Sequence, residues 1–169
     1  WQENDPKQVV KFRSEHGLAE NRTSSIAIGI DGSIWAGTNS AGVSRYDGTA
    51  WQTFTTEDGL PGNSVRDLVV GADGTVWVAT ADGIGRYDGR RWFSYSRGRT
   101  LLQLPSNNVT SLALAPDGIT IYAGTSDGVV QFNGRSWQSL AQIGSTALNS
   151  VQDVTITPDG LLWAATQAG

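Results

Sequence analysis

A chain of 169 residues with 38% hydrophobic residues is long enough and apolar enough to bury a core, which excludes intrinsic disorder. Its formal net charge of -4 opposes the binding of nucleic acid phosphates and anionic lipid headgroups, so we expect neither as a partner. The absence of cysteine excludes disulfides, thiolate nucleophiles and sulfur metal ligands, whereas 21 glycines and 7 tryptophans are typical of aromatic strands joined by tight turns.

No apolar run in the chain approaches the ~20 residues that a membrane-spanning helix needs. Residues 1–8 lack the basic and apolar regions of a signal peptide. The chain starts at Trp1 and contains no methionine, so we expect it to be a processed or excised segment.

The N-terminal part is predicted to hold a tail and one isolated strand. Residues 1–7 form the tail, and Gln8–Arg13 form the strand because their register matches that of Trp51–Thr55 one repeat later. His16 follows in a loop, at the position that Asp58 holds in the next repeat. We interpret this histidine as a solvated loop residue and not as a catalytic one.

From residue 21 onward one sequence pattern recurs four times. An Asp-Gly pair precedes an apolar strand with an aromatic residue at a fixed place, and these aromatic residues are spaced by 42, 45 and 41 residues: Trp35, Trp77, Tyr122 and Trp163. This period is typical of a β-propeller blade. The pattern places blades at about 21–55, 63–96, 107–140 and 149–169, the last with two strands only.

Within a repeat, alternating apolar residues bounded by Asp-Gly turns predict four antiparallel strands. In the second repeat the predicted strands are Val65–Val70, Thr75–Thr80, Gly83–Tyr87 and Arg91–Tyr95. The links are two to five residues long, so each repeat is a four-stranded meander. We therefore predict an all-β fold in which residues 8–169 form one propeller domain, with the four recurring aromatic side chains filling the wedges between neighbouring blades.

The repeat resembles a known family. A third-strand motif occurs as GVSRYDGTAW from Gly42, GIGRYDGRRW from Gly83 and GVVQFNGRSW from Gly128, and DGLPGNSV spans Asp58 to Val65. These motifs are similar to the two-component regulator propeller repeat of bacterial sensor proteins and related extracytoplasmic propellers. The resemblance implies a periplasmic or extracellular location and a sensory or carbohydrate-related ligand role.

One strand, three full blades and half a blade do not close a ring without leaving an exposed strand edge. We therefore expect the chain to belong to a larger propeller, or a second copy or another protein to complete the ring.

Polar residues at the start of each first strand form the predicted binding site, because first strands line the central channel of a propeller. One register holds Ser24, Arg66, Thr110 and Gln152, and the next holds Ser25, Asp67, Ser111 and Asp153. The candidate binding residues are Asn63, Arg66, Asp67, Asn107, Asn149, Gln152 and Asp153. A small neutral or carbohydrate-like ligand would suit them.

Two structural readings of these residues stay open. The recurring asparagines can bond to backbone and serve the fold, which we favour, and Arg66 with Asp67 can form a channel salt bridge without any ligand. A separate insertion in the third link is basic and then apolar. It is either an idle loop, the more common case for insertions, or a candidate protein contact through Arg97, Arg99, Leu101 and Leu102.

Catalytic chemistry has little support in the sequence. A single histidine without cysteine assembles neither a Cys-His pair nor a multi-histidine metal site, so we expect no catalytic residue, metal or cofactor. Gly124–Gly128 matches the G-x-S-x-G pattern, but it joins two strands where a nucleophile elbow needs a strand and a helix. The leading hypothesis is a non-catalytic, sensor-like binding or scaffold module. The alternatives are a lyase or hydrolase resembling streptogramin lyases and a purely structural subunit of a large complex.

Overall fold

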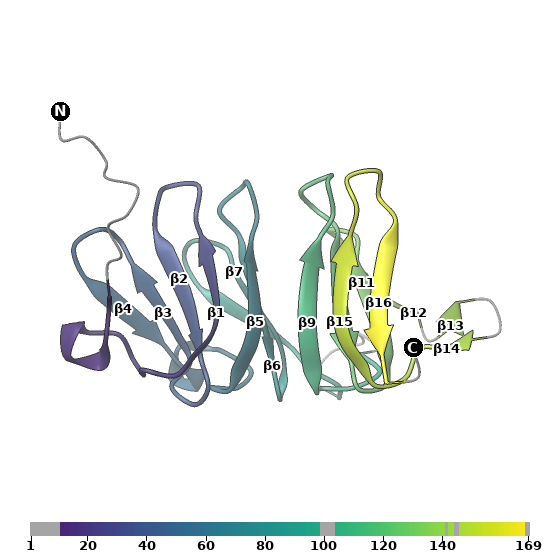
Figure 1. The fold of residues 1–169 in the computed structure, drawn as a ribbon, viewed down its shortest axis with the longest axis horizontal. Coiled ribbons are helices and arrows are strands. Elements are labelled where there is room, and N and C mark those ends of the chain that lie inside the picture. Colours follow the sequence, from purple (N-terminus) through teal and green to yellow (C-terminus); the bar gives the residue numbers. More distant parts are fainter. Residues whose placement is uncertain (1–10, 99–103, 141, 144–145, 168–169) are drawn as a thin grey trace.

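The computed structural model describes residues 11–98, 104–140, 142–143 and 146–167, and nearly all of its regular structure is β-strand (Figure 1). The first blade holds β1 (Thr23–Ile28), β2 (Ile34–Thr38), β3 (Val43–Tyr46) and β4 (Trp51–Phe54). The second holds β5 (Val65–Val70), β6 (Val76–Thr80), β7 (Gly83–Tyr87) and β8 (Trp92–Tyr95). The third holds β9 (Val109–Leu114), β10 (Ile121–Thr125), β11 (Gly128–Phe132) and β12 (Trp137–Leu140).

The remaining elements are short. A two-stranded sheet of β15 (Val151–Ile156) and β16 (Leu162–Thr166) follows the third blade, and single-turn 3-10 helices occupy Ser14–His16 (η1) and Thr56–Asp58 (η2). A small hairpin of β13 (Gln142–Ile143) and β14 (Thr146–Ala147) precedes β15, and the sequence did not predict it. Among the described residues, no helix is long and apolar enough to cross a membrane.

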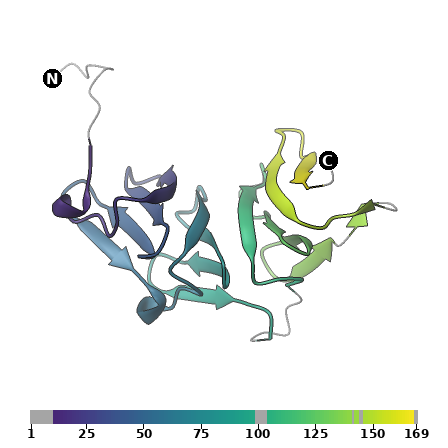
Figure 2. The ribbon, with the colours of Figure 1, turned by 60° about the horizontal axis from the view of Figure 1, so that its bottom comes forward.

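The sheets follow one another along an open arc, with the first blade at one end and the β15–β16 sheet at the other (Figure 2). Strand order within each full blade is sequential, and every pairing is antiparallel. The first strands β1, β5, β9 and β15 are successive neighbours. The predicted propeller fold is therefore confirmed, and the strands of the second repeat differ from the prediction by at most one residue at either end.

Aromatic clusters fill the wedges between the full blades, as predicted. Trp35 of the first blade contacts Phe54 of its own blade together with Tyr87 and Trp92 of the second. Trp77 has the same surroundings one blade later: Tyr95, Phe132 and Trp137. Rings 5.1–6.4 Å apart in stacked, tilted and edge-on arrangements stabilise these junctions beyond the effect of apolar burial alone.

The prediction that the fourth aromatic residue is sealed in a wedge is wrong in this structure. Trp163 on β16 is 60% exposed, and Tyr122 on β10 is only half-buried. The cause is the short last sheet: the rings that cover Trp35 and Trp77 come from the third and fourth strands of the following blade and from the fourth strand of their own blade. The β15–β16 sheet has no such strands, and no sheet follows it among the described residues.

Close approach between blades explains a glycine on the second strand. A Cβ atom at Gly37 would lie 2.5 Å from Cγ1 of Val65 on the next blade, and one at Gly124 would lie 2.8 Å from Cγ1 of Val151. Glycine therefore lets the second strand of one blade approach the first strand of the next.

The predicted strand Gln8–Arg13 is not formed in its described part, residues 11–13. Residues 11–13 are irregular, and residues 8–10 and the predicted tail lie outside the described residues. The fourth strands β4, β8 and β12 each pair with a third strand of their own blade. Within the described part of the chain no third strand lies beside residues 11–13, so no ladder forms there.

Candidate functional site

A β-bulge interrupts the first strand of each full blade and of the β15–β16 sheet at the same place. The pairing register shifts between Thr23 and Ser25 in the first sheet, and at the corresponding positions of the other three: 65/67, 109/111 and 151/153. The bulged residues are Ser24, Arg66, Thr110 and Gln152, which form one of the two polar registers predicted from the sequence. Because a bulge re-aims side chains locally, it gives the two registers different roles.

The second register links neighbouring blades. Oγ of Ser25 accepts the backbone N–H of Leu68 (3.2 Å), Oδ2 of Asp67 accepts that of Leu112 (2.8 Å), and Oγ of Ser111 accepts that of Val154 (2.8 Å). We call this set of bonds the inter-blade ladder. Each bond joins one first strand to the next along the inner edge of the arc.

Asp67 is fully engaged in this ladder. Its Oδ1 accepts hydrogen bonds from the Ser25 hydroxyl (3.0 Å) and from the backbone N–H of Leu68 (2.8 Å), while Oδ2 accepts that of Leu112. Burial raises the pKa of this carboxyl, and the hydrogen bonds oppose the rise. The geometry thus assigns Asp67 to the fold.

Arg66 and Asp67 do not pair, so the salt-bridge reading has no support. One ion pair occurs within the described residues, and it joins Arg45 to Asp31. Arg66 is exposed at its bulge.

The recurring asparagines bond to the loop that follows the preceding fourth strand. Oδ1 of Asn21 accepts the N–H of Ser14 (2.8 Å), and Oδ1 of Asn63 accepts that of Thr56 (2.9 Å). Asn107 accepts the N–H of Arg97 in the same way. These contacts are the structural role that we favoured from the sequence, whereas Asn149 is exposed just before β15.

A polar groove between the third blade and the β15–β16 sheet brings together the best candidates for ligand binding. It has a volume of about 300 Å³, at the small end of the range for ligand sites, and is lined by Asn108, Thr110, Ser126, Ser150, Val151, Gln152 and Gln167. Of the candidate binding residues predicted from the sequence, only Gln152 lines it. Asp153 is the exposed neighbour of Gln152 in the second register.

Backbone strain marks this groove. Ser150, with φ of 51°, is the one non-glycine residue in the left-handed region among the residues described. Its N–H donates to the carbonyl of Ser126 (2.7 Å), and its carbonyl accepts the N–H of Gln167 (3.3 Å). A non-glycine residue with positive φ is strained and is enriched at functional sites. The sequence did not predict this conformation of Ser150: it shows only that the residue after the recurring asparagine varies between repeats.

The chemistry of the groove is neutral and polar. Thr110 donates to the carbonyl of Val151 (2.9 Å), and Ser126 donates to Oγ of Ser106 (2.8 Å). Within the described chain, no hydrogen bond engages the side chains of the other polar lining residues: Asn108, Ser150, Gln152 and Gln167. Each amide offers both donors and an acceptor, which complements ligand hydroxyl groups.

Catalytic groups are not gathered at this groove. His16 is exposed in η1 at the other end of the arc, where its Nδ1 accepts the N–H of Arg13 (3.0 Å), as Asp58 accepts that of Thr55 in η2. The segment from Gly124 to Gly128 spans the end of β10, a two-residue turn and the first residue of β11. The described ranges contain no group of three acidic, histidine or cysteine side chains that could hold a metal ion.

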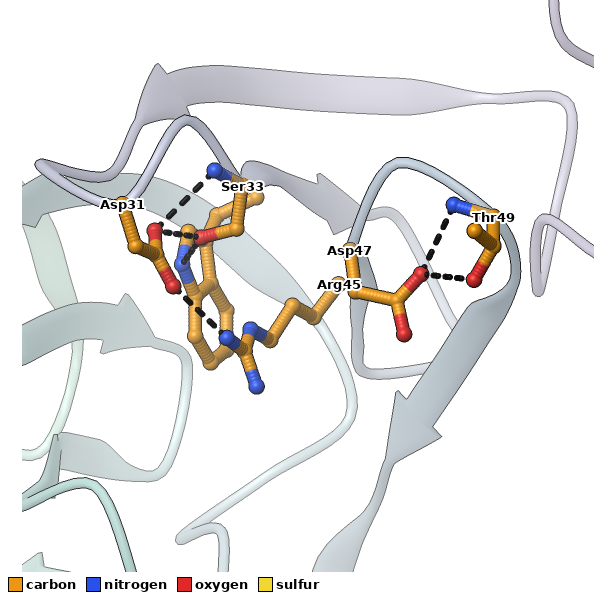
Figure 3. A network of polar contacts seen from close by, with 6 residues as sticks. Asp31, Ser33, Arg45, Asp47 and Thr49 are labelled. Carbon is orange, nitrogen blue, oxygen red and sulfur yellow. Dashed lines mark hydrogen bonds and ion pairs between the residues drawn. The ribbon is translucent and has the colours of Figure 1, made fainter.

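A second set of grooves lies at the Asp-Gly hairpins, and charged side chains there cover the wedge aromatics. In the groove between the first two blades, about 230 Å³ in volume, the Arg45 guanidinium lies 5.5 Å from the centre of the Trp35 ring and 2.7 Å from Oδ2 of Asp31 (Figure 3). Hydrogen bonds from Ser33 and this guanidinium lower the pKa of Asp31 to about 2. Arg86 covers Trp77 in the same way, so these residues protect the junctions.

The predicted contact loop is only partly described. Arg97 is exposed, and its Nη1 donates to the carbonyl of Pro105 (3.2 Å). Arg99, Leu101 and Leu102 lie outside the described residues.

Four-stranded meanders arranged along an arc, with first strands on its inner edge, define the chain as a β-propeller protein. Residues 59–82 match the family described as two component regulator propeller, which confirms, for this segment, the resemblance seen in the sequence. No curated protein matches the chain.

Solved structures share the fold. The extracellular domain of a hybrid two-component system from B. thetaiotaomicron has a TM-score of 0.73 and 22% identity over 92% of this chain and 22% of its own. A catalytically inactive variant of virginiamycin B lyase from Staphylococcus aureus, solved with quinupristin, has a TM-score of 0.63 and 18% identity over 88% of this chain and 53% of its own. A gluconolactonase from Xanthomonas campestris has a TM-score of 0.58 and 15% identity over 83% and 55% of the two chains. The chain therefore spans between about a fifth and just over half of these proteins, and the likeness shows the fold alone.

Proposed function

We propose that the chain is a non-catalytic recognition module that binds a neutral, hydroxyl-rich ligand such as a sugar in the polar groove. The observation that carries this proposal is the set of four neutral polar side chains on one groove without a partner in the described chain. Unsatisfied amides and hydroxyls recognise ligands that both donate and accept hydrogen bonds. The strained Ser150 beside them further supports a binding role.

The proposed setting is the sensor region of a periplasmic or extracellular protein. The propeller repeat and the extracellular two-component domains of similar fold support this setting. The link that begins at the exposed Arg97 is a proposed contact for a protein partner.

Calorimetric titration with neutral mono- and oligosaccharides, and with acidic sugars of the same size, tests the binding proposal. We expect saturable binding of a neutral sugar, with affinity about three- to tenfold lower in Gln152→Ala and in Gln167→Ala, because each loses hydrogen bonds to the ligand. Gln138→Ala, an exposed glutamine on β12 outside the groove, is the matched control and should bind like the wild type. Preference for acidic sugars would contradict the proposal, and the absence of any binding would favour a purely structural role.

The likeness to virginiamycin B lyase supports a second candidate, a lyase or hydrolase. That lyase is catalytically inactive when a histidine is replaced by alanine. In this chain the single histidine, His16, is exposed and bonded to the loop backbone. Incubation with quinupristin followed by mass spectrometry should show an intact substrate, whereas cleavage that disappears in His16→Ala would establish the enzyme.

A further inference from the structure

We propose that the two ends of the arc bind each other between copies, so that the β15–β16 sheet of one copy docks on the first blade of a second copy. The internal junctions between sheets show what each end is built to contact, because the same repeat occupies both sides of every junction. Apolar residues, an aromatic cluster and the inter-blade ladder each point to this occupant.

Among the described residues, the apolar face of a first strand is exposed only in β1, where the described part of the chain holds no preceding blade. Ile26 on β1 is 70% exposed, whereas the residues at the same register of the later first strands are 3–5% exposed: Leu68, Leu112 and Val154. Ile28, two residues on, is 73% exposed, but its counterparts Val70, Leu114 and Ile156 pack into the junction clusters. The first blade therefore presents the half of a junction that normally receives a preceding sheet.

The aromatic cluster at this end lacks one ring. Phe12, Tyr46 and Trp51 contact one another with ring centres 4.9–5.4 Å apart. They repeat the arrangement of Phe54, Tyr87 and Trp92, which surrounds Trp35 at the first internal junction. The N-terminal cluster contains the same three kinds of ring but no second-strand indole.

The other end of the arc carries that indole without a cluster around it. Trp163 is 60% exposed, whereas Trp35 and Trp77 at the same register are 3% and 4% exposed. If this end docks on a second copy, Trp163 would lie among the rings of the N-terminal cluster of that copy. Trp35 has the equivalent position among Phe54, Tyr87 and Trp92.

The inter-blade ladder extends the match to polar groups. Asp153 holds the register at which Ser25, Asp67 and Ser111 accept an N–H from the following first strand, and its carboxylate is exposed. The N–H of Ile26 holds the register of the donors Leu68, Leu112 and Val154. A copy docked by its Trp163 would therefore also bring Asp153 to the Ile26 amide.

Contact between different faces of identical chains is head-to-tail, and it closes only if the rotation between copies closes. Two copies would provide about eight blade positions, with β15–β16 counted as one, which is the upper end of the range usual for propellers. A closed pair would remove both exposed edges.

Two complementary variants test the direction of this contact by analytical ultracentrifugation. The wild type should sediment with twice the mass of the 18.0 kDa chain. Trp163→Ala and Ile26→Asp should each weaken self-association at least about thirtyfold, because each damages one of the two faces. An equimolar mixture of the two variants should recover a heavier species, since each supplies the face that the other lacks.

Exchanges at Asp153 test the ladder. Asp153→Ala should weaken association about tenfold or more, and Asp153→Ser should retain it, because serine fills this role at Ser25 and Ser111. Gln152→Ala, the adjacent bulge residue, should leave association unchanged while weakening sugar binding, which separates this inference from the proposed function.

A wild type that stays monomeric at its highest soluble concentration, an Ile26→Asp variant that still pairs, or a mixture that stays monomeric would each overturn the inference. Circular dichroism spectra of all variants should match the wild type, since these side chains are exposed.

Discussion

Asp67 on β5 accepts the backbone N–H of Leu112 on β9 across 2.8 Å, and this bond crosses from one blade to the next. The strands β5 and β9 belong to separate sheets and form no backbone ladder with each other. The carboxylate of Asp67 links them instead at the inner edge of the arc. Serines do the same at the two neighbouring junctions. The first strands are thus joined by side chains and not by a continuous backbone ladder.

Removing this acceptor should destabilise the fold. Asp67→Ala leaves the amide of Leu112 without its acceptor and leaves that of Leu68 with Oγ of Ser25 alone, and hydrogen bonds to charged groups contribute about 1.5–3 kcal/mol. We expect the free energy of unfolding in urea to fall by that amount. Asp67→Ser should recover part of the loss, as serine accepts the equivalent N–H at Ser111. Equal stability of the alanine variant and the wild type would show that the ladder is not stabilising.

The two tryptophans at the same register should respond differently to truncation. Trp77→Ala removes a ring buried between the second and third blades and should lower the free energy of unfolding by about 3–5 kcal/mol. Trp163→Ala removes an exposed ring and should change the stability of the monomer by less than about 0.5 kcal/mol. Urea titrations at a concentration low enough to keep the chain monomeric provide the comparison, and equal losses would contradict the open end seen here.

Acid should weaken the contacts of Asp31 in the groove between the first two blades. Its pKa is lowered from 3.8 to about 2 in the folded chain, so its contribution to stability is present above pH ~4 and is lost as the pH falls towards about 2. Asp31→Asn keeps an acceptor for the Ser33 N–H but does not titrate. We expect the stability of the wild type to fall more steeply than that of the variant between about pH 4 and pH 2, and parallel profiles would count against this role.

Filling the space at Gly37 should strain the first junction. A Cβ there meets Cγ1 of Val65 at 2.5 Å, so Gly37→Ala should destabilise the chain by about 1–3 kcal/mol. Val65→Ala removes that methyl, and the double variant should be more stable than the sum of the two single effects predicts. Strict additivity in a double-mutant cycle would show that the two residues do not contact.

Much of the fold could be predicted from residue types and spacing. The Asp-Gly turns and the alternation of apolar residues locate the strands of the second repeat to within one residue, because turn chemistry and side-chain alternation are local properties. The wedge roles of Trp35 and Trp77 follow from the same period. The β13–β14 hairpin was not predicted because its strands are only two residues long, too short to show an alternating pattern.

The candidate site was less predictable. A polar first-strand register was evident from the repeat alignment, but the bulge that separates Arg66 from Asp67 was not, because it depends on pairing with the second strand. Gln152 was found, while Ser150 and Gln167 were missed. They reach the groove only through the apposition of two sheets.

The sequence alone determined the repeating unit, its four strands and the aromatic residue that each unit presents, since these depend on neighbours within about forty residues. Tertiary structure alone decided which polar residues join blades, which ones line the groove and which aromatic rings remain uncovered. Those outcomes depend on whether another sheet lies beside each unit. Trp77 and Trp163 occupy the same register, yet one is buried and the other exposed because, among the described residues, a full blade follows only the first.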